Sequence, residues 1–368
     1  MAEQSFSFSQ QTWKRLKKNK AAMVGLCMIL ISFGIALFAY WLAPDNSPNA
    51  DLQTVEIQAK KPGYSQLFLK LDEPKNRAPT SFFSTLISGK LSDFRYIPIS
   101  GYSTSHDSLI IQKFIDSDTS VQQVYSISDI THAHPETLIS EHIVTKKYWL
   151  GTDKFGRDIL SRLLIGTRVS LAVGLIAVII SLFLGILLGA LAGYFRGWVD
   201  DITMWLVNVT WSIPTLLLVF AITLAMGKGF WQIFIAVGLT MWVSVARLVR
   251  GQVMAIRELE YIQAAKAMGA THSRIILRHI LPNISGPILV IAAGNFASAI
   301  IIEAGLSFLG IGVQPPQPSW GLMIKENYNF IITHNPMLAL IPGFAIMILV
   351  LAFNLLGNGL RDAVDVKD

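Results

Sequence analysis

The sequence predicts an all-α polytopic membrane protein with six transmembrane helices and an extracytoplasmic insertion between the first and second helices. Three observations predict this fold class. The 368 residues are 52% apolar and only 15% charged, with a mean hydropathy of +0.49, which is too hydrophobic for an ordinary soluble domain of this length. Six apolar runs are long enough to cross a bilayer. Lysine and arginine are unevenly distributed among the segments between these runs.

The six apolar runs are expected to be helices. A hydrocarbon core about 30 Å thick needs about 20 predominantly apolar residues in helical form, and open sheet edges would leave backbone groups unpaired in lipid. The runs are 21–43, 169–194, 202–225, 229–246, 283–312 and 337–360. The first run is too long for a secretory signal, so we expect it to remain uncleaved. It holds the only cysteine, Cys27, which excludes an intramolecular disulfide and thiol-based metal sites.

The orientation follows from the loops. With a cytoplasmic N-terminus, the inward segments hold 14 Lys/Arg, whereas the two short outward loops hold only Lys228 and Lys325. The inward segments are 1–20, 195–201, 247–282 and 361–368. Since cytoplasmic loops carry the excess of basic residues, we expect both termini to be cytoplasmic. A basic inner surface also suits anionic membrane lipids.

We divide the chain into a basic N-terminus with the first helix (1–43), an extracytoplasmic insertion (44–148) and a five-helix core (149–368) that contains the cytoplasmic loop 251–282. Residues 122–129 of the insertion alternate with the period of a strand, and residues 109–115 fit either a strand or a helix. A small α+β or loop-rich module is expected there.

Histidines and acidic residues gather late in the insertion. The residues are His132, His134, Glu136, Glu141 and His142, which are types that bind zinc. Their spacing matches no established zinc site, so exposed polar residues on a loop are the favoured interpretation and no metal site is predicted.

A polar stretch precedes the second apolar run. Gly151 and Gly156 indicate a turn, and Thr152 or Asp153 can cap an interfacial helix that leads into the membrane. Asp153, Arg157 and Asp158 either form local ion pairs or contact substrate, and the sequence leaves both possibilities open.

Small residues line one face of the second run. Gly185, Gly189 and Gly193 follow each other at four-residue spacing, after Ala177 and Ser181 on the same face. Small residues let helices in lipid approach closely, so this face is expected to pack against another helix, in this chain or in a partner subunit.

Glu303 is the one ionisable residue within the six runs. An intramembrane carboxylate suggests function by default. At about 1.5 Å per residue, however, Glu303 lies about 30 Å beyond Pro282, near the outer interface. A role in translocation and a simple hydrogen bond at a helix interface both remain open. Asn295 and Asn354 are further candidates for helix-to-helix hydrogen bonds.

The loop 251–282 is the one long basic interruption in the apolar second half. Gly269 is a natural left-handed cap, Thr271 can cap a second helix, and Pro282 is expected to end that helix. Arg274 and Arg278, four residues apart, repel each other, which an acidic partner or a lipid surface would relieve. A narrow surface that can enter a groove is formed by Ala264, Ala265, Ala267 and Ala270. A solvated loop lying on lipid headgroups is the alternative.

Gln263, Ala264 and Ala265, followed by Gly269 and by Leu281 with Pro282, have the spacing of the EAA loop. This arrangement resembles the integral membrane subunits of ABC importers. The basic start at 13–20 and the stretches 150–162 and 303–310 are similar, more narrowly, to the C-type permease of the dipeptide/oligopeptide importer family. Two positions depart from the family pattern: Gln263 replaces the leading acidic residue, and His279 replaces the usual isoleucine.

The resemblance implies a type I ABC importer permease fold in a bacterial inner (plasma) membrane. It also implies a sister permease subunit, two ATPase subunits that bind ATP and magnesium, and an extracytoplasmic peptide-binding protein. The loop would then be the ATPase-coupling element, comprising Gln263, Ala264, Ala265, Gly269, Arg274, Arg278, Leu281 and Pro282. No cofactor is expected in this chain, and no nucleic-acid partner.

No catalytic residues are predicted, because the sequence contains no GxxxxGK[ST] phosphate loop, no HExxH and no credible Ser/His/Asp arrangement. A permease for nickel or another small solute is the nearest alternative function. A membrane enzyme is less consistent with the sequence, as is a secondary transporter, which usually carries charged or broken helices at the midplane.

Overall fold

The structure, a computed structural model, describes residues 8–72, 81–105, 108–126, 130, 141–227, 229–332 and 335–364. Its contacts divide the chain into two compact units. We call them the helical unit (Met1–Gly34, Val169–Gln314 and Phe344–Asp368) and the sheet unit (Ile35–Arg168 and Pro315–Gly343). Each unit is described by itself.

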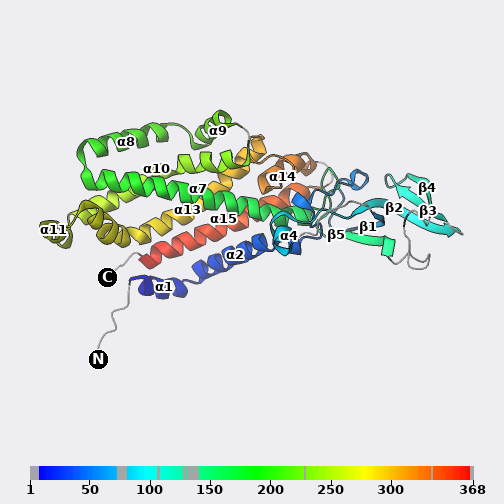
Figure 1. Ribbon diagram of the computed structural model, residues 1–368, viewed down its shortest axis with the longest axis horizontal. Coiled ribbons are helices and arrows are strands. Elements are labelled where there is room, and N and C mark those ends of the chain that lie inside the picture. The colour runs from blue at the N-terminus through cyan, green and yellow to red at the C-terminus, as the bar shows by residue number, and fades with distance from the viewer. Residues whose placement is uncertain are drawn as a thin grey trace, which may run out of the picture. The chain divides into compact units, whose positions relative to one another are not determined.

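The predicted fold class is confirmed. Among the described residues, five helices are long and apolar enough to cross a membrane, or six spans if one bent pair counts as a span. The five are Lys20–Leu37, Ile159–Phe195, Phe230–Arg257, His272–Leu309 and Met337–Val364, which include α2, α7, α10, α13 (Ser285–Leu309) and α15 (Figure 1). A short helix, α1 (Phe8–Lys18), precedes α2.

The third span differs from the prediction. Instead of one helix over 202–225, the structure has α8 (Gly197–Ser212) and α9 (Thr215–Met226), bent by 96° (Figure 1). The bend lies at Ile213 and Pro214, where Ile213 is extended at φ −97° and ψ 129°. Proline lacks an N–H and disfavours helical geometry in the preceding residue, so the helix ends before it.

The fifth span also departs from the expectation, which placed a helix end at Pro282. Helical geometry runs continuously through α12 (His272–Arg274), a π-helical segment (Ile275–Ile280), a 3₁₀ turn (Leu281–Ile284) and α13. Leu281 N–H bonds to the carbonyl of Ile276, five residues back. Pro282 sits in the first turn of the 3₁₀ segment, where a missing N–H is tolerated.

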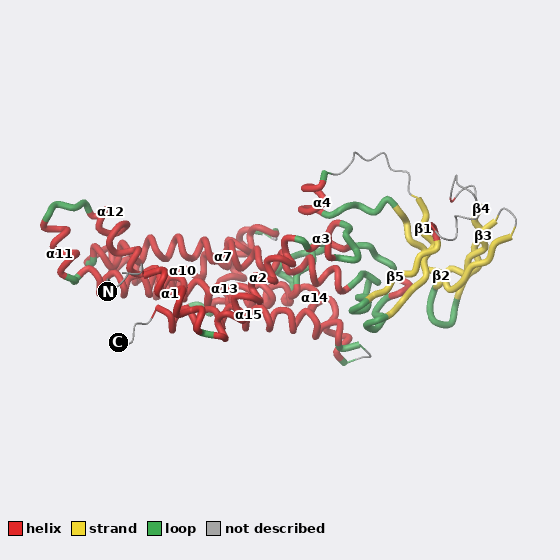
Figure 2. Tube along the Cα trace, turned by 90° about the horizontal axis from the view of Figure 1, so that it is seen from below, coloured by secondary structure: helices red, strands yellow, loops and turns green. Residues whose placement is uncertain are grey.

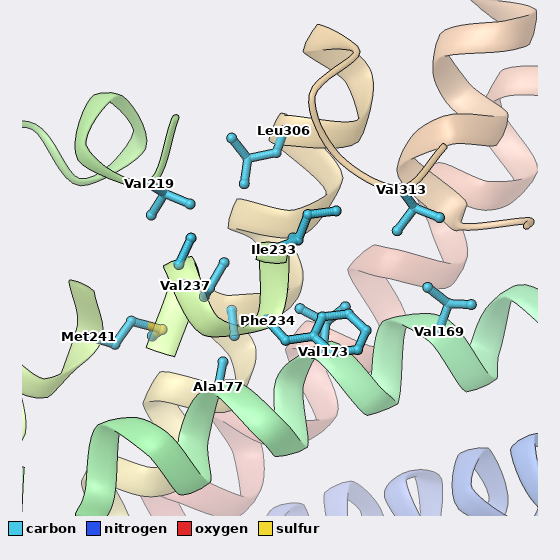
Figure 3. Close-up of a cluster of buried hydrophobic side chains, with 12 residues drawn as sticks. Val169, Val173, Ala177, Val219, Ile233, Phe234, Val237, Met241, Leu306 and Val313 are labelled. Atoms are coloured by element: carbon cyan, nitrogen blue, oxygen red, sulfur yellow. The ribbon is translucent and has the colours of Figure 1, made fainter. Parts of the chain in front are cut away.

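The core of the helical unit forms around α10. Its residues Phe234 and Val237 are fully buried against Val173 of α7 and Leu306 of α13 (Figure 3). Val219 of α9 joins the same cluster. Because side chains of four helices meet here, α10 is the helix around which the unit packs.

The sheet unit contains a five-stranded antiparallel sheet with the order β4-β3-β2-β1-β5 (yellow in Figure 2). Its strands are β1 (Tyr64–Asp72), β2 (Phe94–Ser105), β3 (Ser108–Phe114), β4 (Ser120–Ser126) and β5 (Ile143–Tyr148). Strand geometry over 122–126 confirms the period-two prediction, and residues 109–114, which fitted either type, form a strand. Alternate residues bury on opposite faces, with Leu69 on one and Phe68 on the other.

The remaining elements of the sheet unit are short. They are α3 (Ala39–Leu42), two 3₁₀ turns (Pro48–Ala50 and Val55–Ile57), α4 (Phe82–Ser88), α14 (Trp320–Asn327) and a further 3₁₀ turn (Tyr328–Ile331). Trp320 anchors α14, because its indole N–H donates to the carbonyl of Leu163 at 3.0 Å. This bond ties a segment late in the sequence to the start of α7.

Candidate functional site

The basic loop folds as the expected helix, turn and helix. After α10 ends at Arg257, α11 (Glu260–Ala267) forms and then stops at Gly269, whose φ of +81° is the left-handed conformation that favours glycine. Ala270 N–H bonds to the carbonyl of Ala265 at 3.1 Å. Thr271 caps the next helix, its hydroxyl accepting from Arg274 N–H at 3.4 Å. We call residues 257–282 the hairpin.

One face of α11 is buried inside the helical unit. Ile262 and Ala265, three residues apart and therefore on one helix face, are 2% and 7% exposed. Ile262 packs in one buried cluster with Ile275 and Ile280. Ala265 therefore offers little surface, and its assignment to a partner-binding surface stays a prediction. Ala264 and Met268 are exposed instead, Met268 to 82%.

Gln263 has a contact that the leading acidic residue of the EAA pattern could not make. Its side-chain N–H donates to the carbonyl of Arg257 at 2.9 Å, whereas an ionised carboxylate only accepts. The Arg257 guanidinium in turn donates to the carbonyl of Tyr194, and the Tyr194 hydroxyl lies 2.9 Å from His272 Nδ1. These bonds fix the base of the hairpin to the end of α7.

The basic side chains of the hairpin point outwards. Lys266, Arg274 and Arg278 are exposed, and no ion pair among the described residues involves them. Leu281 is half-buried and Pro282 is exposed. The hairpin thus combines a buried apolar base with an exposed cationic surface.

The glycine face of α7 packs against α10 of this chain, which answers the question that spacing left open. A Cβ at Gly185 would lie 2.8 Å from the carbonyl oxygen of Trp242, and one at Gly189 would lie 2.5 Å from that of Ala246. At Gly193 the corresponding distance is 2.7 Å, to the carbonyl of Arg250. Backbone therefore meets backbone along this seam.

The polar residues of α13 are buried within the helical unit. Asn295 donates to the Ser181 hydroxyl of α7 at 3.5 Å. Glu303 is fully buried and accepts from the Ser307 hydroxyl at 2.7 Å, and that hydroxyl accepts from Val313 N–H at 3.0 Å. Asn295 thus connects α13 to α7, whereas Glu303 bonds within α13 to a serine that itself bonds to the following turn.

The stretch before α7 forms a tight turn in the sheet unit. Gly151 and Gly156 have φ of +83° and +73°, and a Cβ at Gly151 would lie 2.3 Å from the Lys60 carbonyl. The expectation that Thr152 or Asp153 caps the helix is wrong. Asp158 does so, accepting from Ser161 N–H at 2.9 Å, because α7 begins only at Ile159. No separate interfacial helix forms, since α7 continues directly into the apolar run.

Arg157 lies at the centre of a buried ion cluster that sequence reasoning only partly found. It is 2% exposed and pairs with Asp153 at 2.6 Å, Glu326 at 2.7 Å and Asp51 at 3.1 Å. A second buried arginine, Arg162, lies 3.5 Å from Glu326. Burial lowers the pKa of Arg157, but the carboxylates of Asp153 and Glu326 outweigh it and raise the pKa overall. We call these five residues the ion cluster.

Asp51 and Glu326 were missed because no local pattern marks them, whereas Arg162 lies in the stretch 150–162 but was assigned no role. Asp51 is 106 positions and Glu326 is 169 positions from Arg157 in the sequence. Only the depletion of charge in the loop after the fifth run could have drawn attention to Glu326.

The histidine-rich segment of the insertion falls largely outside the described residues, which exclude His132, His134 and Glu136. His142 is described and buried. Within the part of the chain that the structure describes, no group of three or more metal-ligating residues could hold a metal ion.

Comparison with known proteins identifies two matching families. Residues 185–367 match the family described as "Binding-protein-dependent transport system inner membrane component", and residues 7–59 match "N-terminal TM domain of oligopeptide transport permease C".

Individual relatives are similar over most of their length. The glutathione transport system permease protein GsiD of Pectobacterium atrosepticum is 45% identical over 60% of this chain and 73% of its own length. The dipeptide transport system permease protein DppC of Alkalihalophilus pseudofirmus is 44% identical over 60% and 72%. A chain in a solved structure of the MetNI methionine ABC transporter, in inward-facing conformations, is 20% identical over 56% of this chain and 97% of that chain, with a TM-score of 0.46.

Proposed function

Because the chain belongs to the family of inner membrane components of binding-protein-dependent transport systems, we propose that it is the permease subunit of an ATP-driven importer of di- and oligopeptides. The hairpin is the observation that carries this proposal. It holds an exposed cationic surface on a base that is packed into the membrane-spanning helices. Such a surface suits a second protein that must move those helices.

The partners follow from the family. A sister permease would complete the membrane assembly, two ATPase subunits would bind ATP and magnesium, and an extracytoplasmic binding protein would deliver the substrate. The chain itself would carry neither a cofactor nor a catalytic residue. The 14 Lys/Arg of the inward segments support an orientation with both termini in the cytoplasm.

The coupling surface is drawn from the exposed residues of the hairpin. Ala264 is small and Met268 is flexible, so this surface can fit closely into a groove of an ATPase. Lys266, Arg274 and Arg278 add positive charge that favours a groove with an acidic rim. Since Gln263 is hydrogen-bonded within the chain, shape and these cations would provide the contact rather than a glutamate.

The substrate class rests on the relatives, whose names specify glutathione and dipeptides. Both are short peptides, so a peptide is the best-supported cargo. Nickel or another small solute would use the same architecture, and the transport assay distinguishes these cases.

The test is uptake into vesicles that contain the chain together with a sister permease, ATPase subunits and a binding protein. Uptake of a labelled dipeptide that requires both ATP and the binding protein is expected. Uptake of labelled Ni²⁺ without dipeptide uptake would overturn the peptide assignment. Purification of the chain in mild detergent with no associated ATPase would count against the importer itself.

A matched pair of variants tests the hairpin. Ala264→Arg places a long, charged side chain on the exposed coupling surface. We expect at least about tenfold lower ATP-dependent uptake, which corresponds to about 1.4 kcal/mol. Ala21→Arg makes the same change at an exposed position beside Lys20, where an arginine can reach the interface, and should leave uptake unchanged. Equal effects of the two variants would reject the assigned surface.

A further inference from the structure

The sheet unit contains a cavity of about 750 Å³ that the proposed transport role does not use. Its walls are the segment 44–56, strands β2 and β5, and the end of the turn before α7. All of these belong to the sheet unit. The volume falls within the range of about 300–1,000 Å³ that is typical of small-molecule sites.

The charges around this cavity are balanced. Four acidic and four basic residues line it: Asp45, Asp51, Glu56 and Asp158, and Arg95, Lys113, Lys146 and Lys147. Glu56 pairs with Lys113 at 3.2 Å, and Asp51 pairs with Arg157 of the ion cluster at 3.1 Å. Arg95 and Lys147 are exposed. A balanced lining argues against a ligand with a large charge of either sign.

Lys146 is a partly buried amine without an acidic partner. No ion pair among the described residues includes it, and its ammonium lies 3.1 Å from the centre of the Tyr96 ring. Burial lowers the pKa of Lys146 to about 8, although the carboxylates of Asp45 and Asp158 favour the charged form. An aromatic face satisfies an ammonium only in part, so this group is suited to a carboxylate supplied by a ligand.

Asp158 is a buried acidic side chain whose hydrogen bonds are incomplete. It is 6% exposed, its Oδ2 accepts from the backbone N–H and the hydroxyl of Ser161, and its buried Oδ1 has no hydrogen-bond partner among the described residues. Burial raises the pKa of Asp158. Asp45, by contrast, accepts from Ser47 N–H at 3.0 Å and from Leu52 N–H at 3.3 Å. The unpartnered oxygen of Asp158 can accept from an ammonium.

Aromatic side chains also line the cavity. Phe68 and Tyr96 pack edge to face with ring centroids 6.1 Å apart, and Phe94 and Tyr148 also line the cavity. Aromatic faces offer a large apolar contact to a side chain. The cavity therefore presents a cation, aromatic side chains and an anion, and among the described residues the cation and the anion form no ion pair with each other.

We propose that this cavity binds a small zwitterion, an amino acid or short peptide, with its carboxylate at Lys146, its ammonium at Asp158 and an aromatic or apolar side chain against Tyr96 and Phe94. One zwitterion satisfies both groups at once. Such a ligand would also explain why a lysine and an aspartate are held apart at a cost in desolvation. The site is separate from the hairpin and does not depend on the transport function.

The test is calorimetric titration of the full chain in lipid nanodiscs with the dipeptide Ala-Phe. N-acetyl-Ala-Phe lacks the ammonium, and Ala-Phe amide lacks the carboxylate. We expect saturable binding of Ala-Phe and binding about 10- to 100-fold weaker for each blocked dipeptide, the value of one charge-assisted hydrogen bond. No binding of Ala-Phe, or equal affinity for the free and blocked dipeptides, would overturn the proposal.

Two variants test which residue binds which end of the ligand. Lys146→Met should lower the affinity for Ala-Phe about 10- to 100-fold but leave the affinity for Ala-Phe amide unchanged. Asp158→Asn should lower the affinity for Ala-Phe by a similar factor but leave the affinity for N-acetyl-Ala-Phe unchanged. Lys61→Met removes an exposed lysine that does not line the cavity and should leave Ala-Phe binding unchanged. A Lys146 variant that binds all three probes like the unmodified chain would refute the assignment, whether or not the importer transports peptides.

Discussion

Replacement of Arg157 by methionine should destabilise the sheet unit more than any exposed charge change. Methionine retains most of the apolar stem but leaves the carboxylates of Asp51, Asp153 and Glu326 with a single arginine, Arg162. That arginine lies at 3.9, 3.8 and 3.5 Å from them, respectively, whereas Arg157 lies at 3.1, 2.6 and 2.7 Å. The substitution therefore removes the nearest positive charge from all three carboxylates at once.

The magnitude follows from burial. Asp153 and Glu326 are 2% and 8% exposed at their side chains, and breaking a buried ion pair by removing one partner costs about 3–5 kcal/mol. For a unit of about 150–250 residues, 1 kcal/mol shifts the melting temperature by about 2–4 °C. We expect a decrease of about 6–20 °C.

The assay is thermal unfolding of the full chain in detergent, monitored by tryptophan fluorescence, since the sheet unit includes Trp149 and Trp320. The control is Lys90→Met, which breaks a pair of similar length, 2.8 Å to Asp93, whose partners are 49% and 46% exposed. It should cost no more than about 1 kcal/mol.

A second comparison tests the charge reasoning directly. Adding Glu326→Gln to Arg157→Met removes one uncompensated carboxylate, so it should recover part of the lost stability. If Arg157→Met and Lys90→Met shift the melting temperature equally, or if the double variant is less stable than the single one, the ion cluster does not stabilise the unit as described.

Three further predictions concern other parts of the chain. Gly189→Ala should cost about 1–3 kcal/mol of thermal stability through overpacking against α10, whereas Gly294→Ala, which meets nothing within 4 Å, should be neutral or stabilising by up to about 1 kcal/mol. Gln263→Glu replaces a donor by an acceptor opposite the Arg257 carbonyl and should lower ATP-dependent uptake; a rise would show that charge, not the hydrogen bond, governs coupling. Relative to Lys146→Met, the unmodified chain should gain stability in melting experiments as the pH rises from about 8 towards 10.5, because the unfolded lysine retains its proton over that range and the folded one does not; a flat difference would contradict this.

Much of the helical unit could be predicted because hydrophobic length is a local property. The runs at 169–194 and 337–360 each lie within one helix of the structure, and the run at 229–246 does so from Phe230 onwards. The prediction of one helix over 202–225 was wrong because it rested on the average hydropathy of the run. Pro214 barely changes that average, and its effect on the backbone does not depend on hydropathy. In this case the local residue determined the geometry and the composition did not.

The hairpin, too, could be predicted only in part from the sequence. Gly269 and Thr271 could be predicted as caps because capping requires only nearby residues. The burial of Ala265 follows from Ile262 on the same face, and helical spacing alone could have shown it. The ion cluster could not be predicted, because residues such as Asp51 and Glu326 meet Arg157 only once the tertiary fold exists.

The continuity of the helix from His272 to Leu309 has a mechanical consequence. At about 1.5 Å per residue this segment is a lever about 57 Å long, and each degree by which it tilts about one end displaces the other end by about 1 Å. Under the proposed coupling role, a tilt imposed at the hairpin would be passed along this segment to the part of α13 that carries Glu303 and Ser307.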